Sequence, residues 1–91
     1  MQATKGSYLR FYVQEKRRHG GKLLYEWLLE AAKGAGVEGG SAFRAIAGDG
    51  NVEVKFFVST EQAASLLGLL KREGLQIFYA MVPADFGVSG S

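Results

Sequence analysis

Three short stretches of this sequence combine glycine with charged residues in ways that could bind an anion. Gly34–Gly39 reads GAGVEG and matches the G-x-G-x-x-G pattern of dinucleotide-binding loops. Gly48–Asn51, which reads GDGN, joins two apolar stretches. The third stretch, Glu15–Lys22, reads EKRRHGGK and holds the cations Lys16, Arg17, Arg18 and Lys22. Glycine lets backbone N–H groups approach a phosphate, and Arg or Lys neutralises its charge.

The G-x-G-x-x-G match lies in the wrong context for a dinucleotide loop. The binding version follows a strand and opens a helix, so that N-terminal amides meet the pyrophosphate. Here the glycines follow a helical pattern and precede a strand pattern. We interpret Gly34 and Gly36 as residues that end the helix and turn the chain.

The basic stretch has two interpretations. Four cations near the start of a helix could form an anion site, because side chains and helix dipole act together. The plainer interpretation is a solvated loop, which is the usual state of a charged run. His19 is the single histidine of the sequence, and with no catalytic partners in view we expect it to face solvent.

The residue types needed for catalysis or metal binding do not converge. The sequence has no Cys and one His, and its nine carboxylates are scattered along helices and loops. Glu26 and Glu30, four residues apart, are typical of a wet helix face. We therefore expect no catalytic residue, no metal site, no required cofactor and no enzymatic activity.

Hydrophobic periodicity predicts the elements that position these stretches. Alternation predicts strands at 8–14, 41–47, 51–58 and 75–82, the last ended by Pro83. Helical spacing predicts one helix at 22–36 and a second one from Ser59, the N-cap of a capping box with Gln62, to Gly74 as C-cap. This β-α-β-β-α-β order indicates an α+β, ferredoxin-like split fold. Its four-stranded antiparallel sheet has the first and third strands at the centre and both helices on one face.

Length and composition predict one domain and a soluble protein. The 91 residues fit a single domain at 8–86, with a disordered N-terminus at 1–7 and a flexible tail at 87–91. No apolar leader or membrane span is present in the sequence, so we expect a cytoplasmic protein without membrane insertion. A net charge of +2 is too small to argue for nucleic acid.

The sheet face without helices has an unusual predicted surface. Alternation places on it Tyr8, Arg10, Tyr12, Arg44, Ile46, Lys55, Phe57, Phe78, Ala80 and Val82. Such an aromatic face marks an interface, either with other subunits or with a flat ligand such as a base. An RNA-recognition motif has this strand order, but its third strand carries a basic residue followed by Gly, which NVEVKFFV lacks. RNA binding is therefore the alternative and not the first hypothesis.

The sequence resembles the PII-like superfamily over roughly residues 8–82, in the branch of small proteins filed as a domain of unknown function. The resemblance rests on GKLLYE at Gly21–Glu26 and on GVEGGSAFRAIAG at Gly36–Gly48. It implies a homotrimer with the open sheet faces packed around a threefold axis. It also implies that small effectors, commonly adenine nucleotides such as ATP, ADP, AMP or cyclic AMP, bind between subunits. In such proteins the mobile T-loop between the second and third strands then docks on a transporter or an enzyme.

Matched residue by residue, the resemblance places the ligand at the T-loop base. The implied ligand-binding residues are Arg44, Ala47, Gly48, Gly50, Lys55, Tyr12, Gln14, Gly74 and Gln76. The sequence departs from the family where Gly48–Asn51 runs almost directly into Val52. Either the T-loop is lost and an Asp-Gly hairpin remains, or residues of the loop are missing from the sequence; we favour missing residues, because mobile loops most often go unseen. A ligand-free structural oligomerisation domain is the further alternative.

Overall fold

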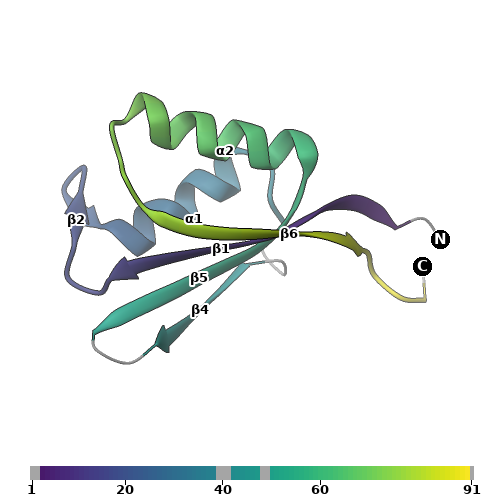
Figure 1. The fold of residues 1–91 in the computed structure, drawn as a ribbon, viewed down its shortest axis with the longest axis horizontal. Helices are drawn as coiled ribbons and strands as arrows, with labels where there is room; N and C mark the ends of the chain where they lie inside the picture. The colour runs from purple at the N-terminus through teal and green to yellow at the C-terminus, as the bar shows by residue number, and fades with distance from the viewer. Residues whose placement is uncertain (1–2, 39–41, 48–49, 91) are drawn as a thin grey trace.

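Four strands form one antiparallel sheet in the computed structural model, and two helices lie together on one of its faces (Figure 1). The structure describes residues 3–38, 42–47 and 50–90. Its elements are β1 (Thr4–Gln14), β2 (Arg18–His19), β3 (Lys22–Leu23), α1 (Leu24–Gly34), β4 (Ala42–Ala47), β5 (Asn51–Ser59), α2 (Thr60–Arg72) and β6 (Phe78–Phe86).

The sheet has the strand order β4-β5-β1-β6, with β1 and β5 at its centre. Leu9 of β1 pairs with Phe56 of β5 on one side and with Met81 of β6 on the other. This is the ferredoxin-like order, and it confirms the predicted α+β fold and the predicted central pair.

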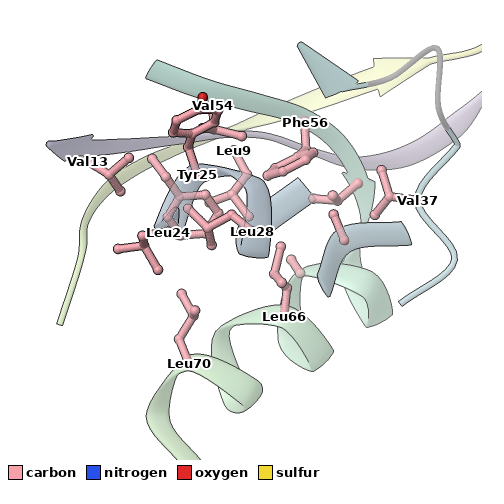
Figure 2. Close-up of a cluster of buried hydrophobic side chains, with 14 of the residues drawn as sticks. Leu9, Val13, Leu24, Tyr25, Leu28, Val37, Val54, Phe56, Leu66 and Leu70 are labelled. Carbon is pink, nitrogen blue, oxygen red and sulfur yellow. The ribbon is translucent and has the colours of Figure 1, made fainter. Parts of the chain in front are cut away.

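The core lies between the sheet and the two helices. Leu9, Phe11 and Val13 alternate along β1 and are buried, as are Val52, Val54, Phe56 and Val58 along β5. They belong to one cluster with residues of both helices, and Figure 2 shows Leu9, Val13, Val54 and Phe56 on the side of the sheet that faces Leu24 and Leu28 of α1 and Leu66 and Leu70 of α2. The alternate residues of the strands and the residues at helical spacing on the two helices therefore pack together in one apolar layer.

Local sequence signals fix the two ends of α2. The Ser59 hydroxyl accepts from the backbone N–H of Gln62 at 3.1 Å, and the Gln62 side chain accepts from the backbone N–H of Ser59 at 2.8 Å. This is the predicted capping box. Gly74 follows the helix at φ 68°, in the left-handed region that terminates helices.

β1 and β6 extend beyond the strands that the sequence pattern predicts. β1 begins at Thr4, so residues 4–7, predicted as part of a disordered N-terminus, pair with β5 and β6 instead. β6 runs from Phe78 to Phe86, and Pro83 does not end it. Proline is tolerated there because β6 is an edge strand, where the missing N–H leaves no partner unpaired.

A small hairpin that we did not predict lies in the basic stretch. β2 and β3 pair Arg18 with Leu23 and His19 with Lys22, around Gly20 and Gly21. Both glycines have positive φ, 61° and 80°, which is what a two-residue type I′ turn requires. Lys22 is consequently a strand residue, and α1 begins at Leu24 rather than at Lys22.

The strand β4 bears on two further expectations. Its register aligns Arg44 with Val54 and Ile46 with Val52, two buried residues of β5, and not with Lys55 and Phe57 as the predicted open face requires. A short strand with apolar residues on both sides does not tell which side faces the core. Ala47 pairs with Asn51, so residues 48–50 join β4 to β5 directly in a continuous chain. The preference for missing loop residues stays a prediction.

Candidate functional site

Three connections lie at the same end of the sheet: β1 to α1, β4 to β5, and α2 to β6 (Figure 1). The pairing explains their proximity, because β1 ends where β5 and β6 begin. Gln14 at the end of β1 pairs with Asn51, and Tyr12 pairs with Phe78. Of the predicted ligand-binding residues, Gly50, Gly74 and Gln76 belong to these connections, and Gln14 is the last residue of β1 before the first of them.

The first two connections are joined at Gly50. The backbone N–H of Glu15 donates to the carbonyl oxygen of Gly50 at 2.7 Å. Gln14, Glu15, Lys16 and Gly50 line a hollow of about 310 Å³. Two predicted ligand residues, Gln14 and Gly50, therefore share one hollow with Lys16 of the predicted anion loop.

The first and third connections are joined by Arg17. Its Nη1 donates to the backbone carbonyl oxygen of Gln76 at 3.0 Å. Gln76 and Gly74 line an open groove of about 700 Å³ between α2 and the start of β6. The other lining residues are mostly apolar: Leu67, Leu70, Leu75, Ile77, Phe78 and Tyr79, with Lys71 adding a cation.

The four cations of the predicted anion loop have different surroundings. Arg18 donates to the carbonyl oxygen of Gly21 at 2.8 Å, inside its own hairpin. Lys22 pairs with Glu30 of α1 at 2.6 Å. Lys16 and Arg17 instead lie at the end of the sheet, so the structure separates them from the other two cations.

His19 is a residue whose role the sequence analysis missed. Its Nε2 lies 2.8 Å from Oε1 of Glu73, the C-cap residue of α2, and its ring packs edge-on against Trp27 at 5.0 Å. The His19 side chain is 23% exposed, so it is partly covered by these contacts and partly in solvent. No local pattern could reveal this contact, because the two partners are 54 positions apart.

Other predicted ligand residues are placed differently. Lys55 pairs with Arg10 on the open sheet face, four residues along β5 from Asn51, and not at the end of the sheet. Tyr12 lies on that face too, with its ring 5.6 Å from the ring of Phe78. The backbone of Ala47 reaches the end of the sheet through its pairing with Asn51, whereas Arg44 pairs with Val54. Gly48 lies outside the described residues.

Two other classes of site find no support in the part of the chain that the structure describes. Within residues 3–38, 42–47 and 50–90, no three His, Asp or Glu side chains gather as metal ligands would. Neither described helix has the length and apolar character of a membrane span.

Three comparisons with known proteins agree with this architecture. The family model DUF190, described as "Uncharacterized ACR, COG1993", matches residues 6–74. A UPF0166 protein of Aquifex aeolicus (strain VF5) is 43% identical over 53 residues, which are 58% of this chain and 50% of that protein. The match thus spans about half the length of that curated relative. A candidate PII-like signaling protein from Thermus thermophilus superposes with a TM-score of 0.67 at 18% identity, covering 94% of this chain and 92% of that one.

Proposed function

This chain belongs to the DUF190 family and has a PII-like fold, and from this premise we propose that it is a non-enzymatic regulatory protein. It binds a small anionic effector where the three connections meet at the end of the sheet. The effector class is an adenine nucleotide, and the protein acts as a homotrimer whose subunits close the clefts. The regulated partner is a transporter or an enzyme.

The placement of Arg17 carries this proposal. Its guanidinium joins the connection after β1 to the turn after α2 by its hydrogen bond to Gln76, which lines the groove together with Gly74. A guanidinium has five N–H donors in a planar fork, and the contact with Gln76 uses one nitrogen. The remaining donors suit the bidentate recognition of a phosphate. Lys16, in the neighbouring hollow, adds a second cation.

The shape and lining of the groove suit a nucleotide. Pockets for small molecules commonly measure about 300–1,000 Å³ and combine apolar walls with a few polar groups. Leu70, Leu75 and Ile77 offer such walls for a base, and Lys71 and Arg17 offer cations for its phosphates. The groove is open in a single subunit, and this is why we place a second subunit beside it in the proposed trimer.

The short connection between β4 and β5 shapes the proposal. With residues 48–50 alone joining the two strands, docking through a long T-loop is not part of the mechanism that we propose. In this proposal the effector contacts the β1–α1 connection and the α2–β6 turn. The hydrogen bond from Arg17 to Gln76 joins these two segments in the absence of effector. A change at this contact on effector binding would alter the surface offered to a partner.

Isothermal calorimetry with ATP, ADP, AMP and cyclic AMP tests the proposal. We expect at least one nucleotide to bind, and Arg17→Gln to weaken its binding by about tenfold or more, because hydrogen bonds to charged groups contribute roughly 1.5–3 kcal/mol. Arg18→Gln is the matched control: it removes the same charge from the same connection, yet Arg18 contacts Gly21 within its own hairpin. No heat with any of the four nucleotides would refute the proposal and favour a ligand-free structural domain.

A further inference from the structure

A histidine–carboxylate contact joins the small hairpin of β2 and β3 to the end of α2. Nε2 of His19, in β2, lies 2.8 Å from Oε1 of Glu73, the C-cap residue of α2. The two side chains are 23% and 41% exposed, so protons from solvent can reach the contact. Each strand of the hairpin has two residues, and a hairpin of this size is not stable by itself in water. The hairpin therefore depends on the elements against which it packs.

The second surface under the hairpin is Trp27 of α1, the single tryptophan of the sequence. The ring of His19 packs edge-on against the indole, with centroids 5.0 Å apart and an interplanar angle of 85°. Gly20 lies close to the same ring, because a Cβ at this position would be 3.8 Å from Cδ1 of Trp27. The indole is partly buried against the core. Its surroundings therefore report whether the hairpin is in place.

The electrostatics at the end of α2 favour a positive charge on His19. Glu73 is a carboxylate at the C-terminal end of a helix, where the macrodipole is negative and cations are the stabilising partners. Lys71 and Arg72 in the last turn of α2 already follow this rule. A protonated imidazole forms a charge-assisted hydrogen bond with a carboxylate, which is stronger than the bond that a neutral ring makes. The contact should therefore be stronger when His19 is protonated.

The other charged groups of the hairpin and its neighbours have different contacts. Lys22 pairs with Glu30 of α1 at 2.6 Å, and Arg18 donates to a carbonyl oxygen of its own hairpin. Arg17 donates to the turn after α2. In ordinary surroundings Lys, Arg and Glu keep their charges between about pH 5 and 8, whereas histidine changes its charge in this range. Protonation of His19 is therefore the charge change that would act on the hairpin.

We propose that the His19–Glu73 contact is a pH-dependent latch: protonation of His19 holds the hairpin against the end of α2, and loss of the proton loosens it. The closed state gains from the bound proton, so this contribution is present at low pH and is lost as the pH rises through the range in which histidine titrates. Arg17 lies two positions before His19, so the latch also restrains the guanidinium that we place in the effector site. Only this last consequence rests on the proposed function.

Amide hydrogen exchange without any nucleotide, at about pH 5.5 and about pH 8, is the first test. Protection factors remove the intrinsic dependence of exchange on pH. We expect protection at residues 18–24 to fall by about twofold to fivefold from the lower to the higher pH, the range of an exposed ion pair. Equal protection at the two pH values would overturn the inference.

Four variants assign the effect to this contact. His19→Gln has no charge at either pH and should show the weaker protection at both, whereas His19→Lys is charged at both and should show the stronger protection at both. Glu73→Gln removes the partner and should abolish the pH dependence. Glu26→Gln is the matched control: it removes an exposed carboxylate from α1, one position before Trp27, and should behave as the wild type. A pH dependence that persists in His19→Gln or Glu73→Gln would contradict the proposal.

The fluorescence of Trp27 provides a second measurement. A protonated imidazole in contact with an indole quenches its emission, so the emission of the wild type should fall on acidification. The fall should be absent in His19→Gln and smaller in Glu73→Gln, because the ring then leaves the indole more often. Emission that responds to pH equally in the wild type and Glu73→Gln would show that Glu73 does not hold the hairpin, and would overturn the latch.

Failure of the latch and failure of the effector site give different results. Exchange and fluorescence are measured without nucleotide, so the latch can be established even if none of the four nucleotides binds. If one binds, Glu73→Gln should weaken its binding about twofold to fivefold at about pH 5.5 relative to Glu26→Gln. Electrostatics alone predicts the opposite, because removing a negative charge should favour an anion. Tighter or equal binding by Glu73→Gln would refute the link between the latch and Arg17.

Discussion

Nη1 of Arg17 donates to the backbone carbonyl oxygen of Gln76 at 3.0 Å, across 59 positions of sequence. This contact joins the connection after β1 to the turn before β6. Beside it, His19 contacts Glu73 at the end of α2. The two contacts hold the basic hairpin of β2 and β3 against one end of the molecule, near the open groove between α2 and the start of β6.

We predict that Arg17→Gln loosens the turn after α2 without unfolding the domain. The contact is exposed, so its loss should cost about 0.5–1.5 kcal/mol of local opening free energy. Amide hydrogen exchange at Leu75–Phe78 should accelerate roughly threefold to tenfold, whereas the core of β1 should exchange as in the wild type. Arg18→Gln, which breaks a contact within the hairpin, should leave residues 75–78 unchanged. Equal exchange in the two variants would show that the Arg17 contact does not restrain the turn.

The second long-range contact, between His19 and Glu73, should contribute little to global stability. Their side chains are 23% and 41% exposed, and water screens ion pairs of this kind. In a double-mutant cycle of His19→Gln and Glu73→Gln, we expect a coupling energy below about 1 kcal/mol in urea unfolding. The Lys22–Glu30 pair provides a second exposed cycle for comparison. A His19–Glu73 coupling above about 2 kcal/mol would mean that the edge-on packing of His19 on Trp27 is part of the same cooperative unit.

The central strands could be predicted because the alternation of apolar residues in the sequence agrees with their burial in the folded sheet. In β1 and β5 the period-two alternation matches the burial, residue by residue, and both strands lie at the centre of the sheet. The capping box at Ser59 and the glycine at Gly74 are local signals that need no knowledge of the fold. The family resemblance added a predicted ligand site near Gln14, Gly50 and Gln76, and that site stays a prediction.

The missed features depend on contacts that the sequence pattern does not encode. Thr4 belongs to β1 because β6 extends to Phe86 beside it, and no local signal near Thr4 indicates that partner. Arg17 reaches Gln76, and His19 reaches Glu73, through tertiary folding alone. The hairpin of β2 and β3 is the exception, since a Gly-Gly pair between polar residues is a recognised turn signal that the charge of the stretch obscured.

The capping box should contribute about 1 kcal/mol to the free energy of unfolding of the domain. Ser59→Ala removes the oxygen that accepts from the Gln62 N–H, and the loss of an N-cap typically costs about 0.5–2 kcal/mol. Urea unfolding measures the change in the free energy of unfolding. Ser65→Ala is the matched control, because Ser65 is an exposed residue inside α2 where alanine is the better helix former. The two substitutions should therefore act in opposite directions, and equal effects would argue that the cap is dispensable.

Two glycines should respond oppositely to the same substitution. A Cβ on Gly6 would lie 1.9 Å from the carbonyl oxygen of Val58, which belongs to the backbone of the neighbouring strand and cannot rotate away. Gly6→Ala should therefore push β1 and β5 apart and cost at least about 2 kcal/mol, in the range of overpacked cores. Gly68→Ala, within α2, meets a side-chain atom of Arg72 at 3.5 Å, an ordinary contact, and should stabilise the domain by roughly 0.5–1 kcal/mol.

Urea unfolding of the two alanine variants measures how tightly β1 and β5 approach at Gly6. Because the substitution is identical, the difference between them reports the surroundings of each glycine and not the chemistry of alanine. Gly6 also pairs with Ala84 of β6, so the strand is confined on both sides and cannot shift as an edge strand would. A Gly6→Ala variant as stable as the wild type would mean that the N-terminal part of β1 can separate from β5 at little cost. Residues 4–7 would then belong to the loose N-terminus that the sequence pattern alone predicts.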